Sequence, residues 1–306
     1  MRNETFTVTS EDEGKRLDVW LTDVLGSLSR SYVGKLIQQG NVTVDGKAQK
    51  AGYKLKTGDY IEISIPEPRQ MEVRAEDIPL DIIHEDNDII VINKPRGMVV
   101  HPAAGNYSGT LVNALLKHCS GSLSDINGVI RPGIVHRIDK DTTGVLVIAK
   151  NNNAHALLSR KLKEHDVKRI YTAVVEGVIN EERGMIDAPI GRHPADRKKM
   201  AVNLKNGKRA VTYFRVLERF KSATLLDLRL ETGRTHQIRV HMSYIGHPLA
   251  GDTVYGRKKQ LYEIDGQALH AAVLGFEHPG TGEYVEYSAE PPEEFKKLVE
   301  KLRHDK

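Results

Sequence analysis

The sequence has 306 residues, with 45 Lys and Arg against 41 Asp and Glu, 39% hydrophobic residues and a single cysteine. This length is sufficient for two domains with hydrophobic cores of their own. The lone Cys119 excludes an internal disulfide framework and any zinc site built from several cysteines. The N-terminal segment lacks the apolar stretch of a secretory signal, and no apolar run is long enough to cross a bilayer. We therefore expect a cytoplasmic protein that does not contact the membrane.

The distribution of charge is more informative than the net charge of +4, which permits nucleic-acid binding without requiring it. Residues 1–65 hold equal numbers of acidic and basic side chains. Residues 192–209 are strongly basic and contain one acidic residue, Asp196. Pro194 and Gly207 in this stretch predict an exposed loop or hairpin. Such a loop is usually just solvated, so it is only weak evidence for phosphate binding.

The N-terminal part predicts a small α/β module. Apolar residues recur at helical spacing over residues 16–25, and Ser29 is placed to cap a second helix that runs to about residue 39. Residues 41–65 predict short strands joined by turns. We expect this module to span residues 14–66 and to be followed by a linker at 67–79.

The remaining residues, 80–306, predict a larger domain that begins with a β-hairpin at about 81–92. Helices are expected at about 109–119, 153–164, 235–246 and 291–302. Strands are expected at 144–149, 169–176, 210–218, 224–231 and 283–288. Because the strands cluster without regular strand–helix alternation, the pattern favours an α+β domain over a doubly wound one.

Three polar segments stand out, and the first is Asn93-Lys94-Pro95-Arg96-Gly97, followed closely by His101. The proline and glycine predict a sharp turn at the end of a strand. Taken alone, this segment indicates a structural turn.

The second segment runs from Gly133 to Gly144 and directly precedes an apolar strand. Catalytic groups often lie at the mouth of such a strand, where a rigid scaffold holds them. Asp139 or Asp141 can instead stabilise the turn through a hydrogen bond to the backbone. A Mg²⁺ site formed by these aspartates with His136 is a third interpretation, which we disfavour because no further pair of carboxylates accompanies it.

The third segment, residues 232–242, predicts a helix that begins soon after Gly233. Arg239 lies next to Ile238, at the edge of the apolar stripe of that helix. A partly desolvated guanidinium there requires a carboxylate partner. His236 and His241 are five residues apart, which does not match the spacing of a helical zinc pair.

In this order, the segments NKPRGMVVHP, GIVHRIDKDTTGVLVIAK and TGRTHQIRVHM resemble the three motifs of the RluA family of RNA pseudouridine synthases. The N-terminal module is similar to the S4-like RNA-binding domain of many members. Ile138 stands where the family more often has Leu, a substitution that conserves volume. The resemblance implies an α+β catalytic domain with a mixed, mostly antiparallel sheet, flanking helices and a central cleft.

The resemblance also implies an isomerase that detaches uracil from its ribose, rotates it and rejoins it through C5, without a cofactor or metal. Asp139 matches the catalytic aspartate, which has to be ionised to act as nucleophile or base. Arg239 matches the arginine that pairs with it, and Tyr171 the tyrosine that packs on uracil. Arg137 is expected to fill the space of a flipped base. His136 is expected to order the loop.

RNA binding is assigned to Arg16, Arg30 and Lys35 in the N-terminal module, and a phosphate contact to Arg234. The implied partner is a structured stem-loop of large-subunit ribosomal RNA. We take a monomer as the default oligomeric state. The same reaction on tRNA and a non-catalytic RNA-binding or ribosome-assembly role are the alternatives. Metal-dependent phosphoryl transfer is a third, which a chelator would reveal.

Overall fold

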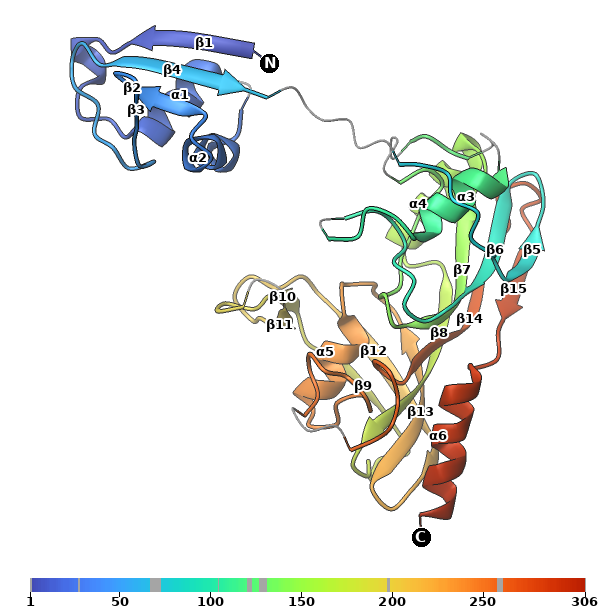
Figure 1. Cartoon of the computed structure of the whole chain (residues 1–306). Helices are drawn as coiled ribbons and strands as arrows, with labels where there is room; N and C mark the ends of the chain where they lie inside the picture. The colour runs from blue at the N-terminus through green and yellow to red at the C-terminus, as the bar shows by residue number, and fades with distance from the viewer. Residues whose placement is uncertain are drawn as a thin grey trace. The chain divides into compact units, whose positions relative to one another are not determined.

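The chain folds into two compact units, Met1–Met71 and Glu72–Lys306 (Figure 1). The computed structural model describes residues 2–26, 28–66, 73–103, 105–119, 123–126, 131–196, 199–257 and 261–305. Within these ranges, no helix has the length and apolar character needed to span a membrane. Hydrophobic clusters lie within each unit, so each has a core of its own.

The first unit packs two helices against a four-stranded antiparallel sheet of strand order β1-β4-β2-β3. Its elements are β1 (Arg2–Thr7), a short 3₁₀ turn (Ser10–Asp12), α1 (Leu17–Leu25), α2 (Arg30–Gln38), β2 (Val42–Val44), β3 (Lys47–Ala48) and β4 (Tyr60–Ile65). Ser29 caps α2 by accepting the N–H of Tyr32 at 3.4 Å. Trp20 and Leu36 are among the residues that form the core between helices and sheet.

Strand β1 was not predicted from the sequence. Its segment is polar apart from Phe6, because it is an edge strand with mostly exposed side chains that pairs only with β4. The partner strand lies more than fifty residues away in the sequence, which local patterns cannot reveal.

The second unit is built on a nine-stranded sheet of order β5-β6-β7-β14-β8-β13-β12-β9, with β15 paired to β14. The strands are β5 (Ile82–Glu85), β6 (Ile89–Lys94), β7 (Thr143–Ala149), β8 (Lys168–Glu176), β9 (Arg183–Asp187), β12 (Val211–Arg219), β13 (Ala223–Leu230), β14 (Leu269–Glu277) and β15 (Tyr284–Ser288). Every pairing is antiparallel except that of β7 with β14. The expected α+β class with a mixed, mostly antiparallel sheet is therefore confirmed.

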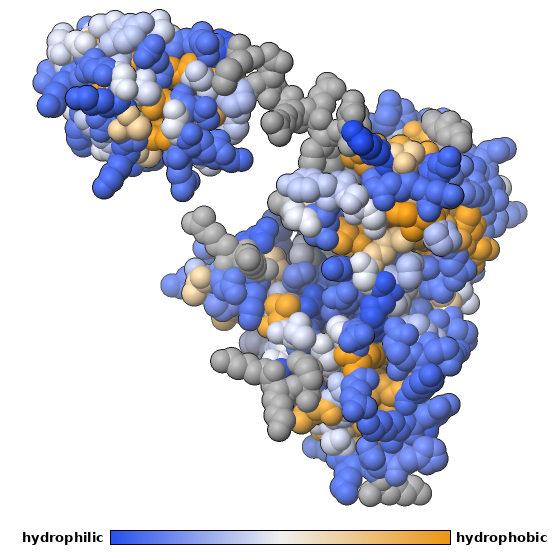
Figure 2. Space-filling view, viewed as in Figure 1, coloured by the Kyte–Doolittle hydropathy of each residue, from blue (hydrophilic) through white to orange (hydrophobic). Residues whose placement is uncertain are grey.

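Helices cover both faces of this sheet. They are α3 (Leu111–Cys119), α4 (Asn152–Lys163), α5 (Gln237–Tyr244) and α6 (Glu293–His304). Helices α3 and α5 share one hydrophobic cluster with side chains on one face of β6, β8 and β13. Helices α4 and α6 pack against the alternate residues of the sheet, whose side chains point to the opposite face. Figure 2 shows a second unit whose visible surface is mostly hydrophilic, with hydrophobic residues in small separate patches.

The basic stretch at 192–209 contributes to a hairpin, as expected, formed by β10 (Ile190–Arg192) and β11 (Met200–Val202). Residues 197 and 198 lie outside the described residues. The helix expected at 235–246 is shorter than predicted and begins at Gln237. His236 has φ of 56°, a left-handed conformation that cannot continue an α-helix.

The parallel contact of β7 with β14 is short, and it positions the second polar segment. Only His270 with Thr143 and Ala271 with Gly144 are in register. Gly144 has φ of 111°, and a Cβ there would lie 2.2 Å from the carbonyl oxygen of Ala271, so only glycine allows this approach. The hydroxyl of Thr143 hydrogen-bonds Nδ1 of His270 at 2.8 Å. The loop that enters β7 is thereby fixed to the centre of the sheet.

Lys94 ties the first polar segment to the second. Its Nζ donates to the carbonyl oxygens of Pro95, Met98 and Lys140 at 2.8, 2.9 and 3.0 Å. Burial lowers the pKa of Lys94 to about 7, against the opposing charges of Asp141 and Asp139. The turn that the sequence indicated is thus a brace for the loop that carries Asp139.

We expect Lys94→Met to destabilise the protein by about 3 kcal/mol, because one buried and two partly buried carbonyls lose their donor, and an unsatisfied buried group costs roughly 1–3 kcal/mol. The measurement is urea unfolding at pH 6, below the pKa of Lys94. Lys296→Met is the matched control, because Lys296 is half-exposed and its ion-pair distances are 3.7 and 3.8 Å. Equal stabilities of the two variants would contradict the bracing role.

Candidate active site

A cavity of about 420 Å³ opens where the second and third polar segments meet. Its walls come from residues 135–142, the end of α4, strand β8, the end of β13, residues 233–239 and Leu269. The volume lies within the range of small-ligand sites, about 300–1,000 Å³. The first polar segment contributes none of these walls but supports them through Lys94 and Arg96. Arg96 donates to the carbonyls of Asp141 at 3.1 Å and Gln267 at 3.2 Å.

Asp139 and Arg239 meet in this cavity, as the sequence predicted. Arg239 Nη1 donates to Asp139 Oδ2 at 3.0 Å. The other oxygen, Oδ1, receives no hydrogen bond from Arg239, and the Asp139 side chain is 18% exposed. The aspartate is therefore held through one oxygen and presents the other to the cavity.

Arg239 is only 7% exposed, so it is more deeply buried than we expected for a residue at the edge of the apolar stripe. Its main partner is Asp252, which sequence reasoning missed. Asp252 Oδ2 accepts from Nε at 2.7 Å and Oδ1 from Nη2 at 2.9 Å. Asp252 also accepts the backbone N–H groups of Val254 and Tyr255. This fork fixes the plane of the guanidinium, so that Nη1 is aimed at Asp139.

The charge states of this group follow from its burial and its partners. Burial opposes ionisation of Arg239, but hydrogen bonds and charge from Asp252 and Asp139 hold its pKa above the ordinary value. Burial likewise works against the Asp252 carboxylate, but Arg239 and two backbone N–H groups hold its pKa below the usual value. One cation thus pairs with two carboxylates, and Arg239 and Asp252 are both charged at neutral pH.

His236 is a second residue that the sequence placed in no site. Its Nδ1 and the hydroxyl of Tyr255 share a hydrogen bond of 2.7 Å, and that hydroxyl oxygen also accepts the N–H of Met200. Its Nε2 lies 3.7 Å from Asp139 Oδ1, the oxygen that Arg239 leaves open. Burial lowers the pKa of His236. The left-handed backbone of this non-glycine residue is typical of a functional site, but it is a feature of the structure that the sequence does not show.

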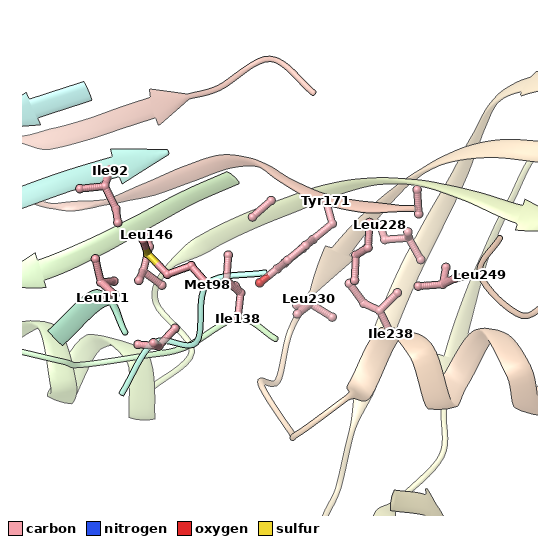
Figure 3. Packing of buried hydrophobic residues seen from close by; sticks show 14 of the residues in the cluster. Ile92, Met98, Leu111, Ile138, Leu146, Tyr171, Leu228, Leu230, Ile238 and Leu249 are labelled. Carbon is pink, nitrogen blue, oxygen red and sulfur yellow. The ribbon is translucent and has the colours of Figure 1, made fainter. Parts of the chain in front are cut away.

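Tyr171 extends from β8 into the cavity wall, with Ile138 on one side and Leu230 on the other (Figure 3). The side chain is 9% exposed and belongs to the main hydrophobic cluster. Burial raises its pKa, and the charge of Asp139 acts in the same direction. A neutral phenol with a flat apolar face is suited to pack against a planar ring.

His136 and Arg137 lie side by side in the loop but have different environments. His136 Nε2 accepts the N–H of Val147 at 3.1 Å, and burial lowers its pKa to about 3, so the ring is neutral at neutral pH. Arg137 is exposed at the cavity wall. Among the described residues, none forms a hydrogen bond or ion pair with its side chain that would hold it in place.

The predicted RNA-binding residues fall on both units. Arg234 lines the cavity, and its Nε donates to the carbonyl of Arg209 at 3.0 Å. In the first unit, Arg16 and Arg30 share the buried Asp18, at 2.9 Å each. Lys35 is exposed on α2. The shared carboxylate holds two exposed guanidinium groups next to each other.

Two of the suggested Mg²⁺ ligands are already engaged in hydrogen bonds. Nε2 of His136 accepts the N–H of Val147, and Oδ2 of Asp139 binds Arg239. A different cluster, His84 with Asp86 and His278, has spacing that suits a metal. However, His278 Nδ1 accepts two backbone N–H groups, which places its proton on the Nε2 that faces Asp86. That nitrogen is a hydrogen-bond donor, not a metal ligand.

Comparison with known proteins matches both units. A family model described as RNA pseudouridylate synthase matches residues 88–244, and an S4 domain model matches residues 15–61. The chain is 54% identical over 303 residues to an uncharacterized RNA pseudouridine synthase of Bacillus subtilis, covering 99% of both chains. It is 49% identical to the ribosomal large subunit pseudouridine synthase D of Zymomonas mobilis, covering 99% of this chain and 98% of the relative.

Among solved structures, human RNA pseudouridylate synthase domain containing 1 is similar, with a TM-score of 0.56 and 27% identity. The match covers 78% of this chain and 98% of the human one.

Proposed function

Because this chain belongs to the RNA pseudouridylate synthase family and carries an S4 domain, we propose that it isomerises uridines of large-subunit ribosomal RNA, with Asp139 as its catalytic group. One observation carries the assignment to Asp139. Its carboxylate lies in the cavity and is fixed by Arg239, which the buried Asp252 holds from the other side. A protein that only bound RNA would have no use for a carboxylate in contact with a polyanion.

The reaction breaks the bond from C1′ to N1 of uracil and forms a bond from C1′ to C5. The hydrogen on C5 is replaced and N1 gains one, so atoms balance without a cofactor. We assign the reacting oxygen to Oδ1 of Asp139, because Oδ2 is engaged by Arg239. That oxygen acts as nucleophile or as base, and both roles require the ionised carboxylate that Arg239 stabilises.

The detached uracil has to stay in the cavity while it turns. Tyr171 provides a flat face for the ring, and Leu230 and Ile238 add apolar walls close to it. These groups form few hydrogen bonds with a turning base, so they confine uracil without fixing one orientation. The polar contacts are left to the Asp139 end of the cavity.

A uridine in a stem-loop must leave its stack to reach Asp139, at a cost of a few kcal/mol. Arg137, exposed at the cavity wall, is placed to occupy the vacated position and to stack there while it binds phosphate. The neutral His136 holds the loop through Val147 and takes no part in proton transfer.

One finding favours ribosomal RNA over tRNA. The relative from Zymomonas mobilis is named a ribosomal large subunit pseudouridine synthase and matches this chain over nearly its whole length. The S4 domain adds a second unit with paired arginines for structured RNA.

The proposed function is tested by incubating purified protein with transcripts of large-subunit ribosomal RNA, small-subunit ribosomal RNA and tRNA. We expect pseudouridine in the first alone, with EDTA present or absent. Pseudouridine in tRNA alone would show that tRNA, and not ribosomal RNA, is the substrate. The absence of pseudouridine from every transcript would favour the binding-factor alternative. Loss of activity in EDTA would contradict the metal-free reaction.

We expect deletion of residues 1–66 to weaken binding to large-subunit RNA by about tenfold, as expected for the loss of a few phosphate contacts. The second unit keeps its fold, because its cores contain no residue of the first unit. Filter binding at physiological salt measures the change, and circular dichroism checks the fold. Charge reversal of Lys301, on the C-terminal α6, is the control in the intact chain. Unchanged affinity after the deletion would contradict the role of the first unit.

A further inference from the structure

Arg169 is a buried cation without a carboxylate partner. It lies on β8, two residues before Tyr171, and is 8% exposed. Its Nη2 donates to the carbonyl of Glu231 at 3.1 Å, and its Nε is buried without any hydrogen-bond partner. Among the described residues, no Asp or Glu forms an ion pair with it. Burial of a guanidinium without a carboxylate partner costs free energy, unless a ligand supplies the missing negative charge and hydrogen-bond acceptors.

Gly233 shapes the space around this guanidinium. A Cβ at Gly233 would lie 2.7 Å from Arg169 Nη1. The glycine of the third polar segment therefore leaves room for the arginine, and both residues line the cavity that holds Asp139. The guanidinium is thus built into the cavity wall rather than into the core.

The neighbouring walls add positive charge. Lys163 and Arg234 line the same cavity, next to His165. The nearby carboxylate of Glu231 is occupied by Arg209 at 2.6 Å and by the hydroxyl of Tyr213 at 2.9 Å. Burial lowers the pKa of His165, and the charges of Arg169 and Arg234 lower it further, against the opposing charge of Glu231.

We propose that Arg169 binds a phosphate that flanks the target uridine and so places the nucleotide with its base against Tyr171. Phosphate is the group that supplies negative charge in an RNA substrate, whereas uracil is neutral and offers only carbonyl oxygens. Two N–H groups of one guanidinium match two oxygens of one phosphate. This inference rests on the proposed function and makes Arg169 a substrate-positioning residue of the same cavity.

The test uses a fragment of large-subunit ribosomal RNA that the native protein converts. The phosphate on the 5′ or the 3′ side of the target uridine is replaced by uncharged methylphosphonate. Binding is measured with proteins that all carry Asp139→Asn, so that the uridine is not consumed. We expect one replacement to weaken binding about tenfold when Arg169 is present, as for a lost charged hydrogen bond, and less than about twofold in Arg169→Gln.

Three further variants make the test specific. Arg169→Lys keeps the charge and should retain most of the sensitivity. Gly233→Ala should displace the guanidinium and lose the sensitivity to methylphosphonate, as Arg169→Gln does. This variant replaces Arg169→Gln in the test if the glutamine variant unfolds. Arg303→Gln, on the exposed α6 pair with Glu218, should match the parent protein.

Equal sensitivity of the parent and Arg169→Gln at both phosphates would overturn the proposal. If Arg169→Gln does not fold, parent-like sensitivity of Gly233→Ala would do the same. Failure of the native protein to convert any ribosomal fragment would contradict the proposed function instead, so the two failures are distinguishable.

Discussion

Replacing Asp139 by Asn should lower kcat by about four orders of magnitude or more, the scale of loss when a nucleophile or base is removed. The amide is almost the same size, so the cavity keeps its shape. It cannot attack carbon or accept a proton, and it leaves Arg239 with a weaker partner than the carboxylate it binds at 3.0 Å. Pseudouridine formed per enzyme in single-turnover reactions measures the loss.

Asp227→Asn is the matched control for that change. Asp227 is also paired with an arginine, Arg215, at 2.7 Å, but lies between Leu226 and Leu228 on β13 and faces away from the cluster that contains Tyr171. We expect its kcat to stay within about twofold of the native value, as for a surface ion pair. Comparable turnover by the Asp139 and Asp227 variants would show that another group carries the reaction.

Asp252→Asn should have the second largest effect, because it breaks a buried ion pair from one side. We expect a loss of about 3–5 kcal/mol in the free energy of unfolding. In the part of the protein that remains folded, Arg239 is no longer fixed in one plane, and kcat should fall about a hundredfold with little change in KM. A merely structural role would leave kcat per folded molecule unchanged.

The pH dependence gives an independent check on Asp252. Its pKa is below the ordinary value in the folded protein, so the unfolded chain binds more protons in acid. The contribution of this carboxylate to stability is therefore present at neutral pH and is lost as the pH falls below about 4. Stability of the native protein should fall more steeply with acid than that of Asp252→Asn.

Glu218→Gln supplies the contrast for stability. Glu218 also forms a two-oxygen pair with an arginine, Arg303, but that arginine is 51% exposed. We expect a cost below about 1 kcal/mol there, because water screens the pair. Equal costs at Asp252 and Glu218 would contradict the argument that burial makes Asp252 essential.

Several elements of the fold were predictable because local chemistry determines them. The cap at Ser29 and the alternation of Leu226, Leu228 and Leu230 against polar residues each appear in the structure where the sequence indicated. Strand β14 was missed. Its segment Leu269–Glu277 is buried on both faces and contains His270 and Gly275, so it shows no alternation and no clean apolar run.

The candidate site was predictable only in part, for a similar reason. Asp139, Arg239 and Tyr171 lie in recognisable segments, and the structure brings all three to one cavity. Asp252 lies in a loop thirteen residues beyond Arg239, and nothing in the sequence shows that it is completely buried. Its importance comes from tertiary burial, which local patterns do not encode.

The most direct test of the central claim is a pseudouridine map of total RNA from cells that lack this protein, complemented with the native chain or with Asp139→Asn. Carbodiimide labelling and reverse-transcription stops locate each pseudouridine. We predict stops in large-subunit ribosomal RNA that return with the native chain and not with the variant. Stops that return with both proteins would exclude Asp139 as the catalytic group, and a map that never depends on the protein would contradict the proposed function.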